Sequence, residues 1–144
     1  MRAIARSTGI LACVGLCCLW ADAHDDIIEL FANVANALST VNPAKFMDAF
    51  DKNMPDYDKL KSEVAALVNQ TEVTSSVEPL KDEGDDAKRS VELDWYLEIR
   101  SLLPDGPVTH RREVIRCELK RDGKRWRIVS LKPVEFFAAA KLDR

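Results

Sequence analysis

Residues 91–100, VELDWYLEIR, alternate apolar and polar side chains without interruption. Successive side chains of a β-strand point to opposite faces of the sheet, so this period of two predicts one buried and one solvated face. The predicted buried face consists of Val91, Leu93, Trp95, Leu97 and Ile99. Asp94 and Tyr96 fall on the solvated face, which favours a surface charge over a catalytic base at Asp94. The rest of the chain must supply the layer that covers the apolar face.

Two more strands follow this segment. Residues 104–107, PDGP, predict a loop, and residues 108–120 predict a second long strand. Asp122-Gly123 is typical of a tight hairpin turn. Residues 126–131 then return as the next strand, which Pro133 ends or confines to an edge of the sheet.

A first, weaker strand is predicted before residue 91. Residues 71–77 are rich in β-branched side chains, and Pro79 ends that strand or places it at an edge. Residues 81–88 are charged and contain Gly84, so we interpret them as a turn.

The first half of the chain is predicted to be helical. Apolar residues recur at helical spacing over residues 27–38 and again over residues 57–69. Between them, Asn42-Pro43 resembles an N-cap followed by proline at the first helical position, which predicts a short helix that buries Phe46 and Phe50. Helices followed by antiparallel strands indicate an α+β fold, in which a curved sheet of about four strands wraps around three N-terminal helices.

Residues 1–23 are predicted to form a secretory signal peptide, and residues 24–144 a single α+β domain in a secreted or periplasmic location. Arg2 and Arg6 precede an apolar run that ends in the cleavage sequence Ala21-Asp22-Ala23. The alternative is an uncleaved anchor, although the apolar run is shorter than the roughly 20 residues that span a bilayer. We therefore expect no transmembrane span in the mature chain.

Composition excludes several classes of function. The 144 residues are 47% hydrophobic and 31% charged, which is sufficient for one domain with its own core. A net charge of −3 argues against broad nucleic-acid binding, because such binding needs a basic surface. Cys117 is the one cysteine outside the signal segment, and its apolar neighbours predict a buried residue rather than a nucleophile.

Neither a metal nor an organic cofactor is expected. His24 and His110 are the only histidines, so a zinc site is not predicted, and the isolated glycines form no phosphate loop. His24 would become the first residue after cleavage, and an N-terminal histidine can chelate copper, but the sequence shows no second copper ligand. The basic residues between His110 and Arg127 would either meet an anionic partner or be balanced by acids elsewhere, and we favour the second alternative.

The last hairpin carries a resemblance to a known family. Residues 115–129, IRCELKRDGKRWRIV, place a tryptophan shortly after the turn glycine, and residues 133–137 fit an exit from the last strand. With the preceding order of elements, this hairpin resembles the nuclear-transport-factor-2-like superfamily, including its SnoaL-like and ketosteroid-isomerase-like domains. The resemblance implies a cone that encloses a pocket between sheet and helices. Some members use that pocket for isomerisation, dehydration or epoxide hydrolysis, others only bind, and many pair as homodimers through the sheet.

Apolar side chains of both layers are expected to line such a pocket for a small apolar ligand. The predicted lining residues are Phe31, Phe46, Phe50, Trp95, Leu97, Cys117 and Trp126. Arg111 and Glu113 share a strand face with Ile115, which places them near the mouth of the cone, where a partly desolvated Glu113 could act as a base. The alternative is an Arg111–Glu113 surface ion pair. Tyr57 could reach the same cavity from the third helix.

Two functions therefore remain open. The sequence favours an exported, non-catalytic domain that binds a ligand or partner, because the Trp95 strand face carries no acid or base. The alternative is a small-molecule isomerase, dehydratase or hydrolase that uses Glu113 with Arg111 or Tyr57.

Overall fold

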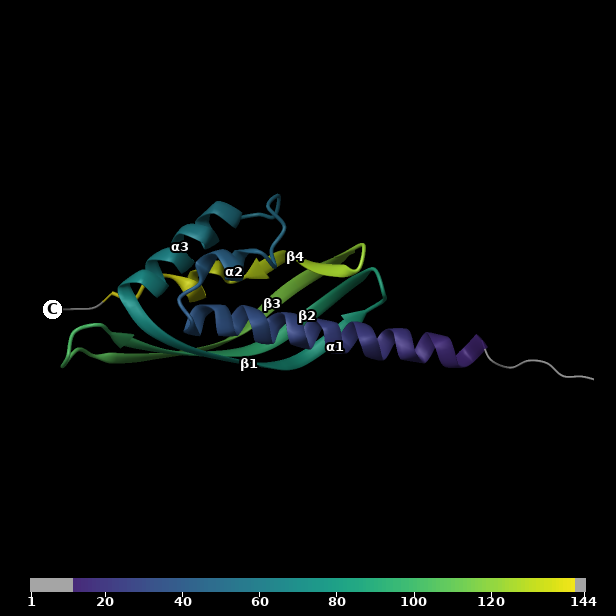
Figure 1. Ribbon diagram of the computed structural model, residues 1–144, viewed down its shortest axis with the longest axis horizontal. Coiled ribbons are helices and arrows are strands. Elements are labelled where there is room, and N and C mark those ends of the chain that lie inside the picture. The colour runs from purple at the N-terminus through teal and green to yellow at the C-terminus, as the bar shows by residue number, and fades with distance from the viewer. Residues whose placement is uncertain (1–11, 142–144) are drawn as a thin grey trace, which may run out of the picture.

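The computed structural model describes the backbone of residues 12–141 and the side chains of residues 22–141. In chain order its elements are α1 (Ala12–Ser39), α2 (Pro43–Met47), α3 (Tyr57–Gln70), β1 (Thr71–Gly84), β2 (Lys88–Ser101), β3 (Val108–Asp122), β4 (Arg125–Lys132) and the 3₁₀-helix η1 (Val134–Phe137). The strands form one antiparallel sheet in the order β1-β2-β3-β4, and the helices lie together over one of its faces (Figure 1). This arrangement confirms the predicted α+β fold.

The first helix is longer than predicted. The apolar stripe predicted a helix over residues 27–38, whereas α1 runs without a break from Ala12 to Ser39, because no proline interrupts the intervening residues. Residues 12–23 of the predicted signal peptide form its first turns, and residues 1–11 lie outside the described residues. Within the part of the chain that the structure describes, no helix combines the length and the apolar character needed to cross a membrane.

The alternation that decides the fold is present in β2 as predicted. The side chains of its inward face are at most 2% exposed, namely Val91, Leu93, Trp95, Leu97 and Ile99. Asp94 and Tyr96 lie on the outer face. In β3, Ile115, Cys117 and Leu119 continue the same buried layer.

The predicted boundaries of β1 are wrong. The strand continues past residue 77 to Gly84, so most of the segment interpreted as a turn, residues 81–88, belongs to β1 or β2. Pro79 does not end the strand, because β1 is an edge strand and one of its sides needs no partner.

A β-bulge in β1 changes which residues face the helices. The register of β1 against β2 shifts between Pro79 and Lys81. Asp82 consequently stands opposite the buried residue Val91 and lies on the inward face, with its side chain 5% exposed. Before the bulge, odd-numbered residues of β1 face inward, so an even-numbered residue such as Asp82 would face outward. The extra residue in the bulge reverses this order and turns the Asp82 carboxylate inward.

An aromatic cluster joins the two layers. Phe31 of α1 meets Trp95 edge-on with ring centroids 6.4 Å apart, and Val34 is 2% exposed in the same core. Phe137 of η1 is fully buried and makes edge contacts with Trp95 at 5.1 Å and with Phe46 at 5.5 Å. The C-terminal turn therefore packs on the core between Trp95 of the sheet and Phe46 of α2.

Candidate functional site

The predicted pocket residues are buried side chains of the core. Phe46, Phe50, Trp95 and Leu97 are at most 1% exposed, and Phe46 stacks on Phe50 with centroids 5.1 Å apart. Phe31, Cys117 and Trp126 are between 2% and 4% exposed. Among these seven, Phe31 also borders an apolar pocket between helix and sheet, which is described below.

Cys117 faces inward from β3 and is the only cysteine whose side chain the structure describes. Burial raises the pKa of its thiol far above the ordinary value, so the nucleophilic thiolate is disfavoured. We expect the native protein to resist alkylation by iodoacetamide at pH 8 and to react promptly in 6 M urea. Rapid labelling of the native protein would show that the thiol is accessible.

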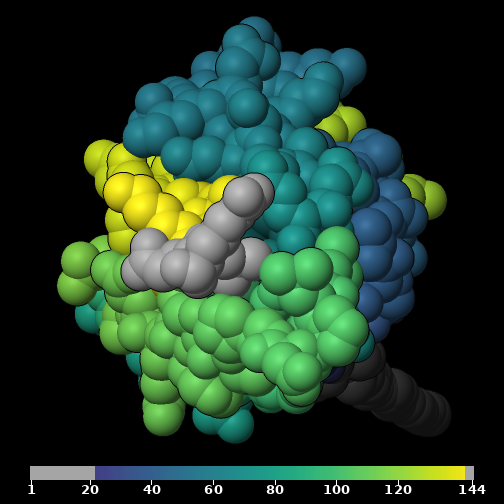
Figure 2. Space-filling view, turned by 90° about the vertical axis from the view of Figure 1, so that its left-hand side faces the viewer, coloured from purple at the N-terminus to yellow at the C-terminus, as the bar shows by residue number. Residues whose placement is uncertain are grey.

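Arg111 and Glu113 lie on the inward face of β3, at the mouth of the cone. Figure 2 views this end of the molecule, where the β2–β3 hairpin, α3 and the C-terminal segment meet. Arg111 stands opposite Leu97, and Glu113 stands opposite Trp95. Both border an open, polar cavity of about 450 Å³, together with His110, Arg112, Pro133, Glu135 and Phe136. The side chain of Glu113 is exposed to water.

The guanidinium of Arg111 does not make the surface ion pair that the sequence suggested as an alternative. Its Nη1 donates hydrogen bonds to the backbone oxygens of Phe136 and Ala138, at 2.8 and 2.6 Å. Arg111 thus fastens the C-terminal segment over the core. Burial lowers its pKa, and the nearby charge of Glu63 opposes that shift.

Glu63 lies close enough to Arg111 for its charge to act on the guanidinium, and the sequence reasoning missed it. Its Oε2 is buried and has no hydrogen-bond partner among the described residues. Glu63 lies on α3 three residues after Leu60 and directly before Val64, which places it beside the buried face of the helix. Its partial burial could have been predicted from this spacing. Tyr57, from the first turn of α3, is half-buried and packs against the core.

Replacing Arg111 by methionine is expected to lower the free energy of unfolding by about 1–3 kcal/mol, because two backbone oxygens lose a charged donor. Arg112→Met is the matched control, since Arg112 is the exposed neighbour on the outer face of the same strand. Loss of its ion pair with Asp94 should have a much smaller effect. Equal shifts of the two urea midpoints would contradict an anchoring role for Arg111.

The outer face of the sheet carries matched charges. Arg112 donates to Asp94 at 3.0 Å, Arg116 donates to Glu92 at 3.1 Å, and the ring of Tyr96 stacks on His110. The hydrogen bond from Arg112 lowers the pKa of Asp94. Two basic residues of β3, Arg112 and Arg116, are therefore paired with acids of β2. The charge balance of the other basic residues between His110 and Arg127 stays a prediction.

An apolar pocket lies at the opposite end of the cone, between α1 and the β1–β2 hairpin. Its volume is about 50 Å³. Its walls come from α1 (His24, Ile27, Ile28, Phe31, Ala32), β1 (Val77, Pro79, Asp82) and β2 (Val91, Leu93). Apart from His24 and Asp82, every side chain in this wall is apolar.

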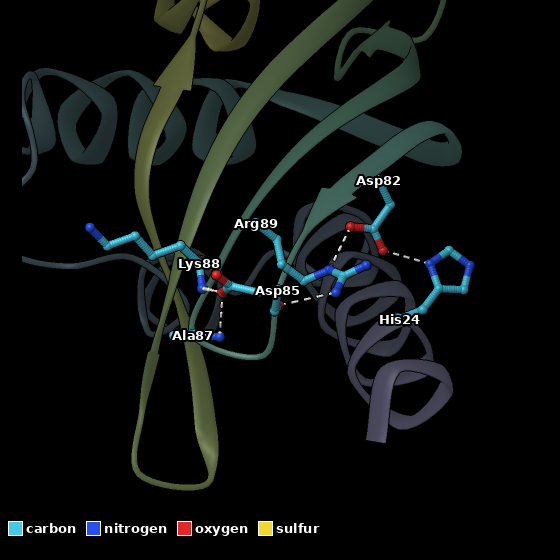
Figure 3. A network of polar contacts seen from close by, with 6 residues as sticks. All are labelled: His24, Asp82, Asp85, Ala87, Lys88 and Arg89. Carbon is cyan, nitrogen blue, oxygen red and sulfur yellow. Dashed lines mark hydrogen bonds and ion pairs between the residues drawn. The ribbon is translucent and has the colours of Figure 1, made fainter. Parts of the chain in front are cut away.

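A buried polar network closes the rim of this pocket. Asp82 lies between His24 and Arg89 (Figure 3). Its Oδ1 accepts from Arg89 Nε at 2.7 Å, and its Oδ2 is 2.6 Å from His24 Nδ1. The side chains of Arg89 and Asp82 are 8% and 5% exposed, whereas that of His24 is 44% exposed. The carboxylate is thus held in place by two donors from different elements.

Residues of the β1–β2 turn form hydrogen bonds that hold Arg89 in place. Arg89 Nη1 donates to the backbone oxygen of Asp85 at 3.1 Å. The Asp85 carboxylate accepts the backbone N–H groups of Lys88 and Ala87, each at 2.8 Å, and these bonds lower its pKa. The turn is therefore ordered by its own side chain, and it positions the guanidinium that faces Asp82.

Sequence reasoning assigned Asp82 to a turn and considered His24 only as a free N-terminus. The inward position of Arg89 could have been predicted, because Arg89 lies two residues before Val91 and alternate residues of a strand share a face. No comparable signal existed for Asp82, since its inward position depends on the bulge.

Several solved structures share this fold at low sequence identity. A Novosphingobium aromaticivorans protein whose proposed activity is scytalone dehydratase has a TM-score of 0.70 at 9% identity, over 78% of this chain and 83% of that one. A conserved protein from Planctomyces limnophilus has a TM-score of 0.69 at 8% identity, over 77% and 93%. A nuclear transport factor 2-like protein from Salmonella enterica serovar Typhimurium has a TM-score of 0.64 at 12% identity, over 77% and 89%.

The chain therefore has the nuclear transport factor 2-like fold, which confirms the resemblance inferred from its sequence. By sequence, no family model matches the chain, and no curated protein matches it at a significant level. Because this fold serves proteins of very different function, the function must be argued from the site.

Proposed function

We propose that this protein is an exported, non-catalytic binding domain that holds the apolar part of a small ligand between α1 and the β1–β2 hairpin. The observation that carries the proposal is the pocket of about 50 Å³, whose wall is apolar except for two side chains at the rim. An apolar wall with a few fixed polar groups is typical of small-molecule sites. Such sites are usually several times larger, so this pocket would hold only one end of a ligand. At the other end of the cone, the candidate base Glu113 is exposed to water.

Export is supported by the positive, apolar and small-residue segments of residues 1–23. Cleavage after Ala23 would make His24 the first residue. The first buried core residue after this point is Ile27, which is 1% exposed. The contact between His24 and Asp82 would then hold the new terminus against β1.

Native mass spectrometry of the exported protein tests both parts of the proposal. We expect the mass of residues 24–144 and an adduct of a small organic molecule. Ala32→Leu adds bulk at the pocket wall and should lose the adduct, whereas Ala44→Leu, on α2 and outside the pocket lining, should keep it. A mass that still includes residues 1–23 would contradict cleavage of the signal peptide. An adduct that survives Ala32→Leu would contradict ligand binding in this pocket.

The same spectrum reports the subunit count. A homodimer through the outer face of the sheet, as the family resemblance implies, would appear at twice the mature mass. We propose this pairing separately from the ligand pocket, which lies on the helix side of the sheet.

A second candidate function, a small-molecule isomerase, dehydratase or hydrolase, uses the mouth of the cone. The observation that favours it is the buried Oε2 of Glu63, which lacks a hydrogen-bond partner in the described part of the chain and lies near Arg111. The co-purified molecule distinguishes the two functions. An enzyme would convert it, as seen by NMR after incubation with fresh protein, whereas a binding domain would return it unchanged.

A further inference from the structure

The contact between His24 and Asp82 fixes the chemistry of the pocket rim. A carboxylate oxygen can only accept a hydrogen bond, so the proton between Nδ1 and Oδ2 belongs to the imidazole. In the neutral ring, the other nitrogen, Nε2, is then an acceptor without a proton. The contact therefore selects one tautomer of His24.

Asp82 is well placed to maintain that tautomer. Both of its oxygens are engaged, one by Arg89 and one by His24, and its side chain is 5% exposed. A carboxylate held in this way orients the ring that it contacts, as an outer partner orients a metal-bound or catalytic histidine. The imidazole itself is 44% exposed and borders the pocket.

The size of the pocket restricts the apolar part of the ligand. An engineered protein cavity that accommodates benzene has a volume of about 150 Å³. The pocket beside His24 has a volume of about 50 Å³, so it can enclose only the end of an aliphatic chain and is too small to take in a ring. Ile27, Phe31 and Leu93 would surround such a chain.

We propose that this pocket selects a short aliphatic molecule that carries a hydroxyl group. The hydroxyl donates its hydrogen bond to Nε2 of His24, and the carbon chain fills the apolar pocket. This inference rests on the proposed binding function and adds the class of ligand to it. In this assignment His24 contacts the ligand directly, and Asp82 is a positioning residue.

A matched pair of probes tests the inference on the exported protein. 1-Butanol and methyl propyl ether are isomers of similar size, but only the alcohol can donate a hydrogen bond. We expect the wild type to bind 1-butanol about tenfold more tightly than the ether, as measured by ligand-observed NMR titration. Without an acceptor in the site, the order would be reversed, because the hydroxyl would lose its hydrogen bond to water.

His24→Phe removes the acceptor and keeps a ring at a half-exposed position. This variant should still bind the ether but should lose the preference for the alcohol, with an unchanged circular dichroism spectrum. Its thermal midpoint should fall modestly, because Asp82 loses one of its two donors. Equal binding of both probes to the wild type, or a preference that survives His24→Phe, would overturn the hydroxyl assignment while leaving the binding function intact. Failure of both probes to bind would count against the proposed pocket itself.

Discussion

Replacing Trp95 by alanine is expected to lower the free energy of unfolding by about 3–5 kcal/mol. Trp95 is fully buried at the centre of the inward face, where its ring meets Phe31 and Phe137. Its Nε1 also donates to the Ser75 hydroxyl at 2.8 Å, so truncation leaves a cavity and an unpaired hydroxyl. An effect of this size is a large fraction of the stability of a small domain.

Tyr96→Ala is the matched control, because Tyr96 is the next residue of the same strand and lies on the outer face. Its loss should cost less than a third of the Trp95→Ala effect, since it removes mainly the contact with His110. Urea denaturation followed by circular dichroism measures both variants. Comparable losses would mean that the two faces of β2 are not differently buried.

Asp82→Ala is expected to lower the free energy of unfolding by a similar amount, about 3–5 kcal/mol. The substitution leaves the guanidinium of Arg89 buried without its partner, and such an uncompensated charge is costly. Removing both charges should be far less harmful, so the double variant Asp82→Leu with Arg89→Met is expected to recover most of the loss.

Asp94→Ala provides the comparison for the Asp82 variant. Asp94 also pairs with an arginine, but its partner Arg112 is 71% exposed, so water replaces the lost contact. The expected order of urea midpoints is wild type and Asp94→Ala, then the double variant, then Asp82→Ala. If Asp82→Ala were as stable as Asp94→Ala, the ion pair would not be buried in solution.

Local patterns in the sequence were sufficient to predict most of the architecture. The period of two in β2, the Asp122-Gly123 turn and the Asn42-Pro43 helix start each depend on residues close together in the chain. The Asn42 side chain accepts the N–H of Lys45, as its position predicted. Each of these features is set by backbone geometry within a few residues.

The candidate pocket could not be predicted in the same way, because its polar rim joins distant residues. His24 and Asp82 are 58 positions apart in the sequence, and they meet only because the bulge turns Asp82 inward. Arg111 likewise finds its partners in backbone oxygens of Phe136 and Ala138, which no side-chain pattern reveals. The predicted location of a pocket between helices and sheet stays a prediction until a ligand is seen there.

A methyl NMR titration with 1-butanol tests most directly that the ligand site lies between α1 and the β1–β2 hairpin. Shifts are predicted for the methyl groups of Ile27, Val91 and Leu93, which border the pocket, and these shifts should vanish in Ala32→Leu. The methyl groups of Leu60 and Val64 on α3 should stay unchanged. Shifts on α3 beside Glu63, or no shifts anywhere at saturating alcohol, would contradict this location of the binding site.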